Sequence, residues 1–312
     1  RLLPATGFWG LLTVSVAHAA ALAPITTLAD ALALRAGVSR DPGTRFEYGS
    51  VRGTGSAVFV VGTLLSGQVV GTWGLGSIIV LHAAFLSAAA CVAVLVPERV
   101  RPQALAQDAV APATEHAPRG LAELLKTRLF RRLMLVTALV LGSHAMHDAF
   151  AVIRWSAGGV TPAMASLLWS EAVAAEVVVF VLIGPALVTR LGPARVLGIA
   201  AAAGALRWVV MASTTALMAL ALVQPLHGVT FAALHLASMR LIVAIVPQRL
   251  AATAQAMYAF GATATTALLT VASGRLYASF GAEGFLVMAL LCVGAVPLAL
   301  RLTIPPAVGE AR

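Results

Sequence analysis

The stretch PERVRPQALAQDAVAPATEHAPRGLAELLKTR, residues Pro97 to Arg128, is the one long polar connection in a chain that is otherwise strongly apolar. It contains four prolines and charges of both signs, a composition typical of a flexible linker. Three apolar spans precede it and six follow it, and the other connections are much shorter. The stretch therefore predicts two helical parts, residues 1–96 and 129–312, joined by a linker at residues 97–128.

The composition of the chain places it in a lipid bilayer. Of the 312 residues, 60% are hydrophobic and 11% are charged, and the mean hydropathy is +0.94. A water-soluble domain could not bury that much apolar side chain. The apolar runs are roughly 20 residues long, the length at which a helix crosses a hydrocarbon core of about 30 Å. We therefore predict an all-α, multi-pass membrane protein with nine transmembrane helices, at residues 8–34, 50–71, 75–96, 130–154, 163–189, 194–214, 217–240, 250–279 and 283–304.

The position of the linker indicates how these helices are grouped. A linker between bundles of six helices is the layout of the major facilitator fold. On this interpretation the nine spans are helices four to twelve of an expected twelve. Residue 1 is an arginine and the first span begins almost at once, so we expect that the first three helices are missing from this chain. The alternative is a complete protein of nine helices.

Positive charge is concentrated in alternate connections. The net charge of +9 could suggest a nucleic-acid partner, but the charge distribution argues against one. The basic segments are residues 35–52, 99–132, 190–195, 240–249 and 301–312. This alternation follows the positive-inside rule, so we expect the linker and the C-terminus in the cytoplasm of a bacterial inner-membrane protein. The two cysteines lie in separate spans, as packing residues do, and do not suggest a disulfide or a metal pair.

Ionisable side chains occur inside four successive spans. Such groups are costly in lipid, and they usually face a bundle interior or an aqueous cavity. At about 1.5 Å of rise per residue, His144, Glu176 and Arg207 each lie about 20 Å from the end of their span. Asp148 is one turn beyond His144 on the same face. We expect these groups to converge on a substrate and proton pathway. Snorkelling of Arg207 and simple hydrogen bonding by Glu176 are the alternatives.

The fourth of these spans carries a polar stripe. In a regular helix Gln224, His227, Phe231 and His235 share one narrow sector. We expect this stripe to line the pathway, although the two histidines could also hold neighbouring helices together. Trp169, Trp208 and Phe231 offer apolar or stacking surface to a solute.

Metal and nucleotide chemistry find little support in the sequence. His144, His147 and Asp148 have a spacing compatible with metal coordination, but no His-Glu-x-x-His motif accompanies them. The chain also lacks the phosphate-binding Gly-x-x-x-x-Gly-Lys motif. We therefore predict that the protein is not an enzyme and binds no metal or cofactor. We expect an ion or substrate gradient as its energy source.

Five segments of the chain resemble the phenylpropionate permease family of the major facilitator superfamily. They are PITTLADALAL (24–34), EYGSVRGTGSAVFVVG (47–62), LLWSEAVAAEVVVF (167–180), RWVVMASTTAL (207–217) and QPLHGVTFAALHLASMR (224–240). Asp30, Glu47, Tyr48, Gly49 and Arg52 are similar to the family's signature. The resemblance implies a twelve-helix fold and proton-linked uptake of a small organic solute.

We therefore predict a proton-coupled symporter that works by alternating access, with an aromatic acid such as a phenylpropionate as its solute. Arg207 would neutralise a substrate carboxylate or pair with Glu176, and Gln224 and His227 would bind polar groups or relay the proton. We expect a monomer whose partners are the solute, protons and the bilayer. The alternatives are a nucleoside or sugar symporter, a drug or sugar efflux protein, and a sensor or scaffold that carries no solute.

Overall fold

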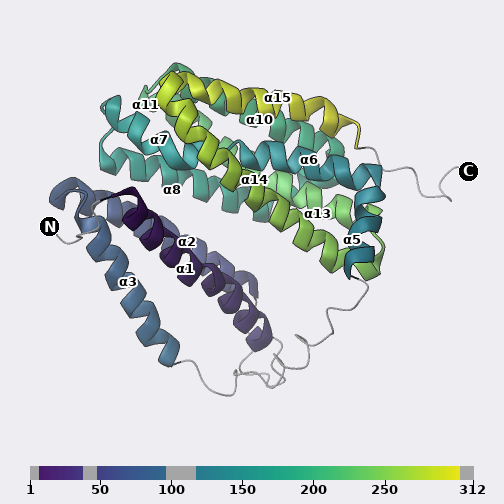
Figure 1. Cartoon of the computed structure of the whole chain (residues 1–312), viewed down its shortest axis with the longest axis horizontal. Helices are drawn as coiled ribbons and strands as arrows, with labels where there is room; N and C mark the ends of the chain where they lie inside the picture. Colours follow the sequence, from purple (N-terminus) through teal and green to yellow (C-terminus); the bar gives the residue numbers. More distant parts are fainter. Residues whose placement is uncertain (1–6, 38–47, 96–116, 303–312) are drawn as a thin grey trace, which may run out of the picture. The chain divides into compact units, whose positions relative to one another are not determined.

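The computed structural model describes residues 7–37, 48–95 and 117–302, and all of its regular elements are helices (Figure 1). Its packing divides the chain into two units, residues 1–55 with 85–110 and residues 56–84 with 111–312, which we describe separately. The first unit contains α1 (Phe8–Gly37), the start of α2 (Tyr48–Trp73) and the end of α3 (Ser77–Val94). No residue of α3 is buried, which suits a surface that meets lipid.

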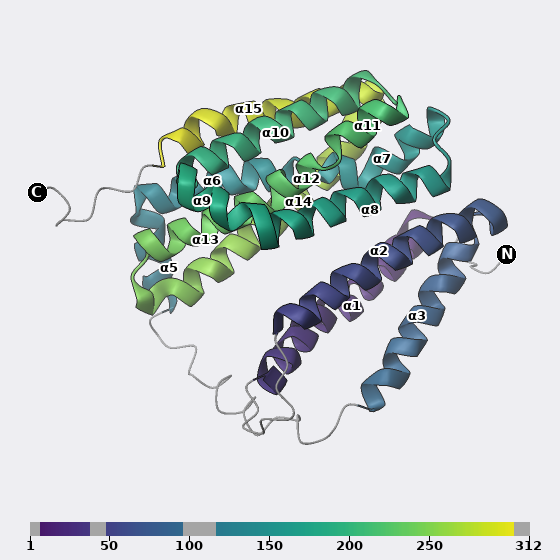
Figure 2. The same ribbon diagram turned by 180° about the vertical axis from the view of Figure 1, so that it is seen from behind.

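The second unit contains the six spans that follow the linker (Figure 2). In chain order its elements are α5 (Ala117–Lys126), α6 (Arg128–Gly142), α7 (Ala145–Ala157), α8 (Pro162–Val178), the π turn η2 (Val179–Ile183), α9 (Gly184–Leu191), α10 (Pro193–Ser213), α11 (Leu217–Val223), α12 (Leu226–Gly228), the π turn η3 (Val229–Ala233), α13 (Leu234–Ile245), α14 (Ala251–Phe280) and α15 (Gly284–Leu300). Helices α10 and α15 lie side by side along most of their length, and α14 crosses α6 (Figures 1 and 2).

The described helices fulfil the prediction of a multi-pass membrane protein. Six stretches of the described residues are long and apolar enough to cross a membrane: Ser77–Val94, Arg128–Ala157, Pro162–Leu191, Pro193–Ser213, Leu217–Ile245 and Thr253–Leu300. The last contains both α14 and α15, and shorter apolar helical stretches lie at Phe8–Leu22 and Ala57–Trp73. Each of the nine predicted spans thus overlaps a described helix. One difference is α5, which forms a helix inside the stretch predicted as linker.

Three of the spans are interrupted, which the sequence pattern does not predict. The span at Arg128–Ala157 breaks after Gly142, and His144 stands at the N-cap position of α7 without a side-chain capping bond. The span at Leu217–Ile245 breaks at Gln224 and Pro225 and then contains η3, and η2 interrupts the span at Pro162–Leu191. Proline has no backbone N–H to donate, which explains the break at Pro225. These breaks leave backbone groups to be paired by polar side chains, and η2 contacts η3 in the middle of the unit.

Two buried clusters hold the six spans together. One contains Phe130, Leu133, Leu197 and Leu234. The other contains Trp155, Trp208 of α10 and Phe285 of α15. Large apolar side chains on the outside, including those of Val181, Leu222, Phe260 and Leu268, are exposed. This inside-out arrangement is the one expected where the surrounding solvent is lipid.

Candidate functional site

Arg207, on α10, is fully buried and lies at the centre of a polar cluster. Its NH1 group donates to Thr230 Oγ1 at 3.2 Å, and its NH2 group donates to Gln224 Oε1 at 3.2 Å. NH1 also lies 3.3 Å from His144 Nε2 and 3.4 Å from His227 Nδ1. None of these partners is a carboxylate. The guanidinium is therefore a buried cation that makes no direct ion pair with a described carboxylate, an arrangement that is costly in a protein interior.

The hydrogen bonds of His144 determine which of its ring nitrogens carries the proton. Its Nδ1 lies 3.0 Å from the carbonyl oxygen of Val140, which can only accept, so Nδ1 is the donor. Its Nε2 lies 3.0 Å from Thr230 Oγ1 and faces Arg207, which can only donate. His144 is consequently a neutral acceptor toward Arg207.

His227 connects Arg207 to Glu176. Its Nε2 lies 3.4 Å from Glu176 Oε2, while its Nδ1 faces Arg207. Its ring stacks on that of Phe231 at 5.6 Å between centroids. The sequence left open whether Arg207 pairs with Glu176. In the structure the two side chains are linked through His227 and make no described direct contact. Both His227 and Glu176 are partly exposed, at 17% and 24% of the side chain.

Gln224 stands where α11 ends, and its side chain is almost completely buried. Its Oε1 accepts from Arg207, which orients the amide and leaves Nε2 as a donor. Gln224 Nε2 and Arg207 Nε are both buried without a described partner. Buried donors are rarely left unpaired in proteins, so these two N–H groups are available to donate to a further oxygen atom.

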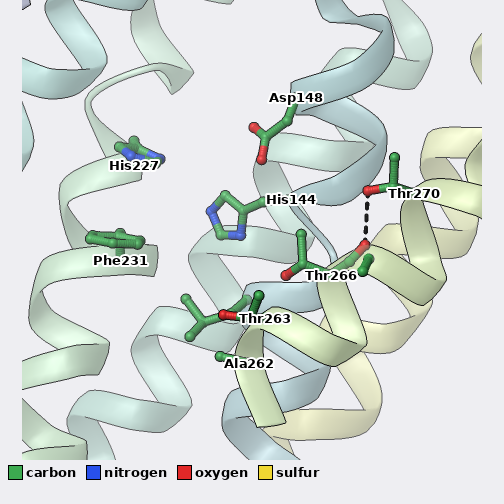
Figure 3. A pocket seen from close by; sticks show the side chains of 10 residues that line it. His144, Asp148, His227, Phe231, Ala262, Thr263, Thr266 and Thr270 are labelled. Carbon is green, nitrogen blue, oxygen red and sulfur yellow. Dashed lines mark hydrogen bonds between the residues drawn. The ribbon is translucent and has the colours of Figure 1, made fainter. Parts of the chain in front are cut away.

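Beside the cluster lies a pocket with a volume of about 460 Å³, within the range of small-molecule sites (Figure 3). His144 and Asp148 face it from one side and His227 and Phe231 from another, as Figure 3 shows. The remaining lining residues are Leu141, Ala262, Thr263, Thr266, Ala267 and Thr270. Arg207 does not line the pocket, but two imidazoles that contact it do.

Asp148 pairs with His147 at the edge of this pocket. His147 Nδ1 lies 3.2 Å from Asp148 Oδ1, and the Asp148 side chain is 53% exposed whereas that of His147 is 2% exposed. The His147 ring lies among Trp155, Trp169 and Trp208, with centroids 4.8–5.8 Å away. Trp169 therefore contacts His147 and is absent from the pocket lining.

Trp208 packs on the other side of the cluster. The Arg207 guanidinium lies 4.7 Å from the centroid of its ring, within the range of a cation–π contact. Its indole Nε1 donates to Ser143 Oγ at 2.8 Å, at the break between α6 and α7. Trp208 thus fixes Arg207 from behind and does not line the pocket.

His235 lies apart from this cluster. Its ring contacts those of Phe180 and Tyr258, with centroids 5.9 and 5.6 Å away. The expectation of one stripe from Gln224 to His235 assumed a regular helix, and η3 lies between His227 and His235. A π turn closes hydrogen bonds five residues apart, so it shifts the phase of everything after it.

The predicted family-motif residues lie in a part of the chain that the structure describes incompletely. Glu47 lies outside the described residues, and so do the side chains of Asp30, Tyr48 and Arg52 and the surroundings of Gly49. Within the described part of the chain, no three His, Cys, Asp or Glu side chains gather as metal ligands.

Thr230 is the main residue of the cluster that the sequence analysis missed. Its Oγ1 contacts both His144 and Arg207 and lies 3.2 Å from the backbone oxygen of His227. It belongs to η3, and a threonine in an apolar span carries no sequence signal of its own. The threonines of α14 that line the pocket were missed for the same reason.

Comparison with known proteins decides the family. Residues 1–287 match the MFS_1 like family. The chain belongs to this family of major facilitator transporters. It is also 32% identical, over 95% of its length and 76% of the relative's, to a protein of Escherichia coli (strain K12) named "Probable 3-phenylpropionic acid transporter". The chain is accordingly a multi-pass membrane transporter and not an enzyme, which confirms the predicted fold class and the resemblance.

Proposed function

We propose that this transporter carries a small aromatic acid together with protons across the bacterial inner membrane. The observation that carries the proposal is the buried Arg207, which has only neutral partners and stands behind two histidines of a pocket. A buried cation without a direct ion pair is costly, and an anionic solute nearby would offset part of that cost. The name of the Escherichia coli relative supports an aromatic acid as the solute.

The positive charge of Arg207 acts on the pocket through His144 and His227. In a medium of low dielectric constant, charges a few ångströms apart interact far more strongly than in water. A carboxylate in the pocket would therefore be attracted toward these two imidazoles. The ring of Phe231, which lines the pocket and stacks on His227, offers the solute an aromatic surface.

Two groups that face the pocket can carry the proton. Asp148 is half exposed there, and an ionised Asp148 would repel a carboxylate solute. Protonation removes that repulsion, so that proton and solute favour each other's binding, which is the requirement for symport. His227 lies between Arg207 and Glu176 and can pass a proton to Glu176.

Solute-induced proton movement tests this function. Full-length protein in proteoliposomes should take up protons when 3-phenylpropionate is added, and should not respond to the uncharged amide of the same acid. A response to the amide as strong as that to the acid would contradict the role of the carboxylate. Uptake of a neutral sugar or nucleoside in preference to the acid would contradict the solute class.

A further inference from the structure

Helix α14 presents a row of threonine hydroxyl groups to the pocket. The proposed function assigns no role to this row. Thr263, Thr266 and Thr270 all line the pocket, and they recur at intervals of three and four residues (Figure 3). Residues at such intervals lie on one face of a helix, with neighbouring Cβ atoms about 5–6 Å apart. The row stands across the pocket from His227 and Phe231.

The three hydroxyl groups differ in whether they are already bonded. Thr270 Oγ1 donates to the backbone oxygen of Thr266 at 2.8 Å, the local bond that threonine commonly makes within a helix. Thr137 and Thr189 make the same kind of bond within their own helices. Thr263 and Thr266 have no described hydrogen-bond partner for their hydroxyl groups, and in Figure 3 both are seen at the pocket.

Two free hydroxyl groups in a pocket between apolar helices suit a solute that has hydroxyl groups of its own. If the carboxylate is drawn toward His144 and His227 and the ring lies near Phe231, the substituents on the far side of the ring are directed toward α14 across the pocket. Each threonine hydroxyl can both donate and accept, and so it can pair with a ring hydroxyl in either direction. An unsubstituted ring that covers these hydroxyl groups would displace water from them and leave them unpaired, which costs free energy.

We propose that Thr263 and Thr266 are specificity-determining residues that bind hydroxyl groups on the ring of the solute. This inference rests on the proposed function, and it narrows the solute class to ring-hydroxylated aromatic acids.

A binding comparison with matched variants tests it. The affinity of purified full-length protein is measured for 3-phenylpropionate and for the same acid with one or two ring hydroxyl groups. The unmodified protein should bind the hydroxylated acids more tightly. Thr263→Val and Thr266→Val, which keep the shape of the side chain, should each weaken that binding by about threefold to tenfold. They should leave the affinity for 3-phenylpropionate unchanged or slightly higher.

Thr189→Val, in α9, is the matched control, because its hydroxyl group is bonded within its own helix and the residue lies outside this pocket. It should change neither affinity, and Thr263→Ser and Thr266→Ser should retain the preference because serine keeps the hydroxyl. Equal binding of all the acids by the unmodified protein, or equal losses for every acid in the valine variants, would overturn this inference alone. Absence of binding for every acid would overturn the proposed function with it.

Discussion

At the scale of single residues, the site depends on a guanidinium held in place by neutral partners. Arg207 has four described polar contacts, which come from the residue before α7, the residue after α11, α12 and η3, and it has a ring contact with Trp208. Its partners are oriented in turn, since His144 is fixed by Val140 and His227 by Glu176. A positively charged group held in this way keeps its place behind the pocket, and it attracts an anion in the pocket without rearrangement of its neighbours.

Asp148→Asn separates solute binding from proton coupling. The asparagine oxygen can still accept from His147, but the side chain no longer carries charge or a removable proton. We expect the acid to bind up to about tenfold more tightly, or about 1.4 kcal/mol, because the repulsion is gone. Gradient-driven accumulation should be lost while exchange of solute across the membrane persists.

The control for this variant is Glu171→Gln, which neutralises a carboxylate on α8 outside this pocket. It should leave accumulation unchanged. Normal accumulation by Asp148→Asn would show that this carboxylate is not part of the coupling.

The sequence identified most of these residues, because an ionisable group in a membrane span is rare enough to be informative. His144, Glu176, Arg207, Gln224 and His227 were all expected, and the structure brings them together. Their pairing could not be derived, since depth along a span does not fix which side chains touch. Threonines escaped notice because they occur freely in membrane helices.

At the scale of elements, the spans come together most closely where glycines allow it. A Cβ atom at Gly228, in α12, would lie 2.6 Å from the backbone oxygen of Ala175 and 2.8 Å from Val179 Cγ2. Residue 228 is next to His227, so this close approach of α12 to α8 also places His227 beside Glu176. The close packing of α12 on α8 therefore also determines the geometry of the site.

Gly228→Ala should destabilise the protein by about 1–3 kcal/mol, because a backbone oxygen cannot move aside as a flexible side chain can. The thermal unfolding midpoint in detergent should fall. Gly294→Ala in α15 is the matched control, since a Cβ there meets nothing within 4 Å. Alanine favours helix over glycine by up to about 1 kcal/mol, so this variant should be neutral or more stable. Equal midpoints for the two variants would contradict the packing described at Gly228.

The ends of the helices could be predicted closely from the sequence, whereas the interruptions within the spans could not. Most predicted span boundaries lie within about three residues of the described helices, because hydropathy changes sharply at the connections. Hydropathy cannot detect a π turn, since a π turn changes hydrogen bonding and not composition. That is why His235 was expected beside His227 and is found with Tyr258.

At the scale of the whole molecule, we propose the bundle boundaries 1–96 and 129–312, with the linker at 97–128 and the C-terminus in the cytoplasm. The basis is the alternation of basic connections along the chain. Single cysteines in a background without Cys91 and Cys292 test this orientation. Trp73→Cys, at an exposed position next to a connection with almost no basic residues, should react with an impermeant thiol reagent from outside.

Arg119→Cys, in α5, should react only when the reagent reaches the cytoplasmic side. Labelling of both positions from the same side would contradict the proposed topology. Labelling of position 119 from outside, with position 73 labelled from the cytoplasmic side, would indicate the opposite orientation in the membrane.

The central claim is that the cluster around Arg207 couples the binding of an acid to the movement of a proton. The most direct measurement compares gradient-driven uptake with exchange in reconstituted full-length protein. We predict that His227→Gln abolishes uphill uptake but retains exchange, because exchange needs no net proton movement. Arg207→Gln should abolish both, because it removes the charge that attracts the acid. Unchanged uptake and exchange in both variants would contradict the account, since these residues would then only hold the helices together.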